Sequence, residues 1–262
     1  MNSLPNLFKL FPIHKHKYAQ WFQNMHFNGK VLSDSERKDV IDVMDYYIKH
    51  YIHGLSLLQK AKASVKVSPR EDIKAYHQLS SSLLFVTMTI IDSMVISKYF
   101  LLAKVDYEQR LMRGKLFVIM NEGFKRLFGF DEKTQKKSEW KKLSSILDCF
   151  PNEIKEQYNE LTPLLERHAN NSTWWKDERN CETHLDAEQL FESRQKQIIE
   201  SKVMMDSLKL YETLFAVDVF ISNMHACMVN HFTLELFHRE DLDIYYIPQI
   251  TEIHHNFKTI IH

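Results

Sequence analysis

Apolar residues recur at three- and four-residue spacing along much of this chain, a pattern that predicts α-helices. The first predicted helix follows the capping residues 33–36 and runs to about residue 64. The second starts near Pro69 and continues to about residue 104 without glycine or proline. Its stretch 83–102 is apolar on most sides, which indicates a central core helix.

The same periodicity predicts helices over 106–128, 139–148, 152–168 and 193–237, with Gly129 ending the first of these. Glycine and proline number only 5 and 6 in 262 residues. Average usage is about 7% plus 5%, so turns and hairpins are scarce and long helices are favoured. We therefore expect an all-α, up-and-down helical bundle over residues 36–240. An irregular or short-helical N-terminal arm (1–35) packs on this body, and a C-terminal tail (241–262) follows it.

The charge balance is neutral, with 34 basic and 34 acidic residues. This excludes a global basic field of the kind that attracts nucleic acid, so any RNA contact must come from a local patch. Five lysines between residues 131 and 142 form the one such patch. We interpret it as a solvated loop and helix start.

Several features favour a cytoplasmic protein outside the membrane. The three cysteines are far apart and include no Cys-x-x-Cys pair, which fits free thiols in a reducing compartment. The first residues lack the basic and apolar regions of a signal peptide. The apolar stretch 83–102 contains Asp92 and Lys98, so we expect a buried helix there instead of a membrane span.

One stretch, residues 173–184, carries candidate chemistry. It contains Arg179, Asn180 and His184 in the pattern Arg-Asn-x-x-x-His, between long helical segments. Histidine titrates near neutrality and can accept a proton from a 2′-hydroxyl or donate one to a leaving oxygen. Arginine stays charged and binds phosphate bidentately, which stabilises extra negative charge in a transition state. This set suits RNA phosphodiester cleavage without a metal.

The segment from Arg179 to His184 resembles the R-N-x-x-x-H motif of the HEPN superfamily (higher eukaryotes and prokaryotes nucleotide-binding domains). The surroundings are also similar: long helices precede the motif, Asp186 closely follows its histidine, and another long helix comes after. The likeness covers residues 36–237 as helix order only, and it is specific at the motif alone.

The resemblance implies an α-helical bundle that forms a homodimer, with the motifs of both chains meeting in a cleft. Many relatives are metal-independent endoribonucleases of toxin–antitoxin or phage-defence systems, and they leave a 2′,3′-cyclic phosphate. By this resemblance Arg179 and His184 would be catalytic, with Asn180 and Glu182 supporting. RNA and a protein partner such as an antitoxin would be the ligands, and no cofactor or metal would be needed.

A second hypothesis is a non-catalytic helical module that binds another protein. In that case Arg179 pairs with a neighbouring acidic residue (Asp177, Glu178 or Glu182), and His184 is a hydrogen-bonded surface residue. Arg70 and His77, separated by six residues at a predicted helix start, also mimic the motif spacing.

A metal-binding bundle is the third hypothesis. Glu235 and His238 have the Glu-x-x-His spacing of di-iron bundles, but such sites need a second copy and two further glutamates, and no second copy falls in the interior of a predicted helix. Histidine pairs such as His50 and His53 lack the cysteine cluster or His-Glu-x-x-His pattern of zinc sites. Phosphate-binding glycine-rich loops and Gly-x-Ser-x-Gly are absent, which argues against the usual nucleotide-dependent kinases and serine hydrolases.

Overall fold

The computed structural model describes residues 31–67, 69–150, 152–171 and 199–238, and helices make up most of this part of the chain. No strand occurs among the described residues, so the all-α prediction is confirmed for them. The predicted N-terminal arm before residue 31 and the C-terminal tail after residue 238 lie outside the described ranges.

Three long helices follow one another. They are α3 (Asp34–Ser64), α4 (Glu71–Leu102) and α5 (Asp106–Leu127), each close to its predicted position. A capping box fixes the start of α3: the Ser33 backbone N–H donates to Glu36 Oε2 (2.6 Å), and the Glu36 N–H donates to Ser33 Oγ (3.3 Å). Gly129, just after α5, has φ +88°, a left-handed conformation that glycine adopts without strain.

The connection after α5 differs from the prediction. Instead of one helix over 139–148, the chain forms α6 (Glu132–Gln135), α7 (Glu139–Ser144) and a 3₁₀ turn, η2 (Leu147–Cys149). The hydroxyls of Ser144 and Ser145 donate to the carbonyls three residues before them, at 2.7 Å each. Serine side chains that bond to the backbone in this way compete with the helical ladder, and here the helix ends at this point.

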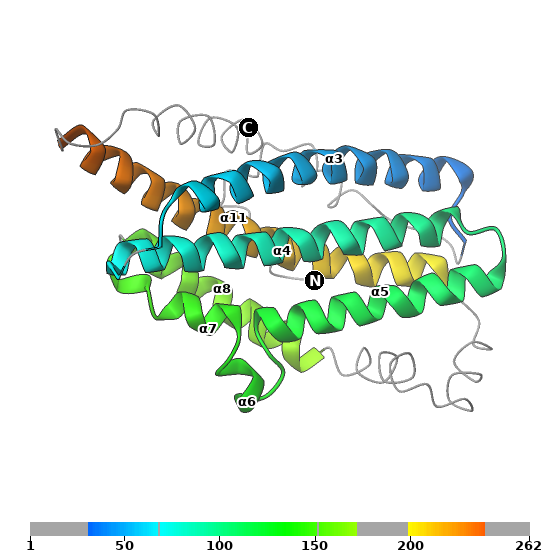
Figure 1. The fold of residues 1–262 in the computed structure, drawn as a ribbon. Coiled ribbons are helices and arrows are strands. Elements are labelled where there is room, and N and C mark those ends of the chain that lie inside the picture. Colours follow the sequence, from blue (N-terminus) through cyan, green and yellow to red (C-terminus); the bar gives the residue numbers. More distant parts are fainter. Residues whose placement is uncertain (1–30, 68, 151, 172–198, 239–262) are drawn as a thin grey trace.

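Two further helices complete the described bundle, α8 (Asn152–Asn171) and α11 (Glu200–His238). Helix α8 ends at Asn171, three residues beyond the predicted end at residue 168. Helix α4 contacts α3, α5 and α11, while α8 packs on α11. In Figure 1, α3 and α5 lie on either side of α4, and α11 lies behind it.

Side-chain pairs show that α4 runs antiparallel to its three neighbours. Lys62 and Asp45 of α3 bond to Ser81 and Lys98 of α4, respectively. The pairs between α4 and α11 have the same reversed order: Ser80 with His225, Thr87 with Asp218, and Ser97 with Tyr211. On the α5 side, α4 comes so close at Gly123 that an added Cβ would lie 2.4 Å from Thr89 Cγ2.

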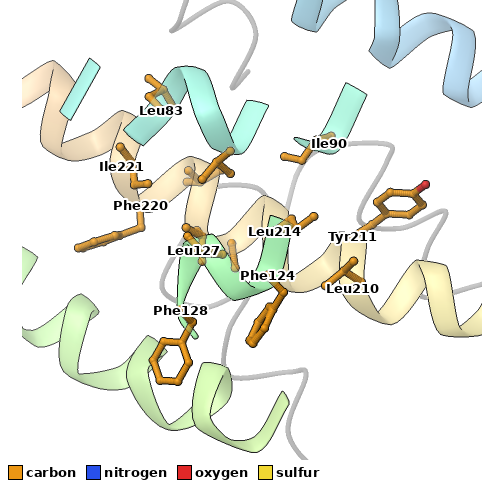
Figure 2. Close-up of a cluster of buried hydrophobic side chains, with 14 of the residues drawn as sticks. Leu83, Ile90, Phe124, Leu127, Phe128, Leu210, Tyr211, Leu214, Phe220 and Ile221 are labelled. Carbon is orange, nitrogen blue, oxygen red and sulfur yellow. The ribbon is translucent and has the colours of Figure 1, made fainter. Parts of the chain in front are cut away.

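One hydrophobic cluster joins residues of the described helices. Figure 2 shows part of it, where Leu83 of α4 lies beside Ile221 of α11 and Ile90 of α4 lies beside Leu214 of α11. Helix α4 is long and apolar enough, by length and composition, to cross a membrane, and 61% of its most apolar window is buried inside the bundle. Its hydrophobic side chains therefore supply the surface on which three other helices pack.

Candidate functional site

The predicted catalytic segment connects α8 to α11. Arg179, Asn180, Glu182 and His184 all lie within residues 172–198, outside the described part of the chain. The structure therefore neither brings these four residues together nor separates them. It does describe the two helix ends to which the segment is joined.

His168 lies near the end of α8, before the predicted catalytic segment. Its ring packs on Phe124 of α5, with 4.6 Å between the ring centroids. Burial lowers the pKa of His168 to about 4, so the imidazole is neutral at physiological pH. This histidine is thus suited to packing, and its protonation changes only in acid.

Glu200 starts α11 after the predicted catalytic segment, and its carboxylate is bonded to three other parts of the bundle. Arg37 Nη2 of α3 donates to it at 2.6 Å, Gln109 Nε2 of α5 at 2.7 Å, and the Leu32 backbone N–H at 3.2 Å. Arg37 also donates to the carbonyl of Leu101, in the last turn of α4 (3.0 Å).

These bonds gather four helix ends around one buried charge. The Glu200 side chain is only 6% exposed and that of Arg37 is 20% exposed. An ion pair removed from water in this way requires further hydrogen bonds, which Gln109 and the Leu32 backbone supply. The start of α11 is therefore held firmly against α3, α4 and α5.

A second polar group lies in the middle of the bundle. Thr87 of α4 donates to Asp218 Oδ1 of α11 (2.8 Å), and Tyr51 of α3 also hydrogen-bonds to this carboxyl. Burial outweighs these two bonds and raises the pKa of Asp218 to about 7. The side chain thus exists partly as the neutral acid near physiological pH.

Two helical turns further along α11, His225 forms a similar contact. The Ser80 hydroxyl lies 3.3 Å from His225 Nε2, and the ring of Tyr76 lies 5.1 Å from the imidazole between centroids. Burial lowers the pKa of His225 to about 4. His225, Asp218 and Thr87 are all buried, so a substrate reaches them only if the helices separate. We assign them to stability and not to catalysis.

All five lysines of the stretch 131–142 are solvent-exposed, as predicted, although Ser138, Glu139 and Trp140 between them are buried. Two of them are paired, Lys136 with Glu132 (2.7 Å) and Lys142 with the buried Glu139 (2.8 Å). Burial favours the neutral form of Glu139, but hydrogen bonds from Lys142 and Ser82 outweigh it, so its pKa is lowered. These acidic partners reduce the positive charge available to RNA.

The sequence offered two other candidate pairs, Arg70 with His77 and Glu235 with His238, and the structure describes part of their surroundings. Arg70 precedes α4 and its Nε donates to Asp72 (3.1 Å), while no described residue hydrogen-bonds to the buried Nε2 of His77. Glu235 and His238 belong to α11, but the structure does not describe their side chains. No cluster of three or more potential metal ligands occurs within the described ranges.

Glu200 and Asp218 were not predicted from the sequence to be functional residues. Asp218 carried a usable signal, because it stands in the apolar run 214–221 of a helix that the periodicity predicts to be buried. Glu200 carried no comparable signal, since its partners come from residues far away in the sequence.

Comparison of the whole chain with known proteins adds no support to the HEPN resemblance, which therefore depends on the motif alone. No family model, curated protein or solved structure matches this chain.

Proposed function

We propose that this protein is a HEPN-like, metal-independent endoribonuclease or RNA-binding protein that acts as a homodimer in the cytoplasm. The observation that carries the proposal is the motif Arg179-Asn180-Cys181-Glu182-Thr183-His184, placed between two long helices of an all-α protein. The motif combines a group that transfers protons at neutral pH with a permanent cation that binds phosphate.

In the proposed reaction His184 removes the proton of an RNA 2′-hydroxyl, and the 2′ oxygen attacks the adjacent phosphorus. The bond from phosphorus to the 5′ oxygen breaks, and that oxygen takes up a proton. The product is a 2′,3′-cyclic phosphate and a free 5′-hydroxyl. Arg179 stabilises the extra negative charge on the phosphate oxygens, while Asn180 and Glu182 support the two catalytic side chains.

The bundle fixes the start of α11, the helix that follows the motif in the sequence. Glu200 lies sixteen residues after His184, and its carboxylate is bonded to Arg37 of α3, Gln109 of α5 and the Leu32 backbone at once. A rigid attachment favours catalysis because reacting groups must be held within a narrow range of geometry. Toxin–antitoxin or phage-defence roles, with a protein partner such as an antitoxin, fit an RNA-cleaving protein of this kind.

The test is cleavage of a mixed RNA pool by the purified protein in EDTA. Wild type is expected to cleave, and His184→Ala and Arg179→Ala to lose activity. The exposed His53, on α3, provides the matched control, and His53→Ala should cleave as wild type does. If folded wild-type protein cleaves none of the RNAs, the non-catalytic interaction module becomes the better account.

A further inference from the structure

Helix α4 has one side that no described helix covers. Five residues form this open face of α4: Met88, Asp92, Val95, Tyr99 and Leu102. Met88, Tyr99 and Leu102 are 52%, 56% and 48% exposed, which is high for large apolar side chains on the central helix of a bundle. In Figure 1 this side lies between α3 and α5, opposite α11.

The spacing of the open face indicates what packs there. Its residues are separated alternately by three and four positions, the repeat by which one helix packs along another. Asp92 is the single charged residue in this stripe. No ion pair of the described residues includes it, and desolvation by its surroundings raises its pKa. A fitting partner is therefore an apolar helical stripe with one central cation.

Residues 1–30 contain such a stripe. Pro12 is suited to the first turn of a helix and the pair at 28–29 (Asn-Gly) to its end, so the sequence predicts a helix over about 12–27. One side of it combines Tyr18, Phe22 and Met25 with Lys15, at the same alternating spacing as the open face. The opposite side carries Lys17, Gln20 and Asn24 between Ile13 and Phe27, and residues 1–30 contain four lysines and no acidic residue.

Chain connectivity sets the direction of this helix. A short connection of residues 28–33 joins it to α3, and consecutive helices with short connections run antiparallel. Because α3 is itself antiparallel to α4, helix 12–27 would run parallel to α4. The start of α3 lies beside the end of α4, since Arg37 donates to the carbonyls of both Leu32 and Leu101.

Connectivity also selects the register. With Met25 at the level of Leu102, the remaining pairs follow in step: Phe22 with Tyr99, Tyr18 with Val95, and Lys15 with Asp92. A shift by one heptad moves the helix by about 10 Å, at 1.5 Å per residue. That shift takes Met25 either beyond the end of α4 or away from the start of α3. Only this register also places the lysine beside the aspartate.

We propose that residues 12–27 form a helix that covers the open face of α4 in parallel orientation, with Lys15 paired to Asp92. The N-terminal segment is then a fifth helix packed on this side of the bundle. Burial of Met88, Tyr99 and Leu102 supplies the apolar contact, and the ion pair fixes the register. This inference does not depend on RNA cleavage.

Disulfide trapping in the full-length protein tests the register. Phe22→Cys combined with Tyr99→Cys should form an intramolecular disulfide under mild oxidation, identified by peptide mapping. The matched control joins Phe22→Cys to Met88→Cys, which the register separates by eleven residues, about 16 Å along the helix. It should cross-link several-fold less. Equal yields in both variants, no link in the first, or a link between two chains would each overturn the proposal. The last result would indicate a contact between two copies of this chain.

Charge reversal provides a second measurement that needs no added thiol. Lys15→Asp and Asp92→Lys should each lower the thermal midpoint, because each places two like charges side by side. The doubly reversed protein should recover part of the loss, since the pair is restored with opposite polarity. Losses that simply add in the double variant would contradict a contact between these residues.

Discussion

Asp218 is a carboxylic acid enclosed by apolar helices. Its partners, the hydroxyls of Thr87 and Tyr51, stabilise the carboxylate less than burial destabilises it, so its pKa rises to about 7. An aspartate in the unfolded chain titrates near about 4. Unfolding in the range between these values therefore releases a proton.

Asp218→Asn is expected to stabilise the protein at pH 8 by up to about 4 kcal/mol, the equivalent of the pKa difference at about 1.4 kcal/mol per unit. In wild type, the free-energy cost of holding the buried Asp218 as a carboxylate is absent below about pH 4. It grows as the pH rises to about 7 and is constant above that value. Asparagine keeps the acceptor for Thr87 and carries no charge. Urea unfolding at pH 4, 6 and 8 measures the effect.

The control for this substitution is Asp148→Asn, because the side chain of Asp148 is fully exposed in the 3₁₀ turn. It should change stability by less than about 0.5 kcal/mol at each pH. A stability difference between Asp218→Asn and wild type that does not vary with pH would show that Asp218 is ionised throughout the range.

At the scale of helices, Glu200 at the start of α11 bonds to Arg37 of α3 and Gln109 of α5 and so holds three helix ends together. Glu200→Gln keeps the size of the side chain but leaves the guanidinium of Arg37 without a carboxylate partner. We expect a loss of about 1–3 kcal/mol in the free energy of unfolding, because the unpaired cation is mostly buried. Denaturant unfolding of both proteins at neutral pH gives the difference.

Glu132→Gln is the matched control. It breaks the pair with Lys136, whose side chains are 84% and 69% exposed, and should cost less than about 0.5 kcal/mol. If the two variants lose equal stability, the Glu200 contacts do not hold the helix ends together.

The positions of α3, α4 and α5 were predictable because periodicity and end signals coincided. Ser33 and Glu36 supply the capping box of α3, and Gly129 supplies the turn after α5. Helix α6 was missed because four residues are too few to show a period, although Asp131 caps it. Helix α7 was predicted too long, since the backbone bonds of Ser144 and Ser145 do not appear in a hydrophobic pattern.

At the scale of the whole molecule, the buried His225 and the partly buried His168 make the bundle sensitive to acid. Burial lowers the pKa of both His168 and His225 to about 4, whereas an unfolded histidine titrates near about 6.5. The unfolded chain therefore takes up protons first as the pH falls. The stability that these residues contribute is complete above about pH 6.5 and is lost as the pH falls towards 4.

His225→Gln should make the loss of stability between pH 6.5 and pH 4 shallower, because one of the two proton uptakes disappears. The exposed His53 again gives the control, since His53→Gln should leave the pH slope unchanged. Chemical denaturation across this pH range provides the slopes. Parallel slopes for wild type and His225→Gln would mean that His225 titrates alike in the folded and unfolded chains.

The pairing of residues across helices could not be predicted from the sequence. Glu200 with Arg37, Asp218 with Thr87, and His225 with Ser80 each join residues more than 100 positions apart. Local periodicity identifies which side of a helix is apolar, but it does not specify which polar residue of another helix lies opposite. Arg179 and His184 were identified from sequence alone, and their catalytic role remains a prediction because they lie outside the described residues.

The most direct test of the proposed function is analysis of the RNA ends produced in EDTA by wild type and by His184→Ala. The account predicts fragments that end in a 2′,3′-cyclic phosphate with wild type and no such fragments with His184→Ala. Cleavage retained by His184→Ala, or none by the folded wild-type protein, would contradict a ribonuclease centred on this motif.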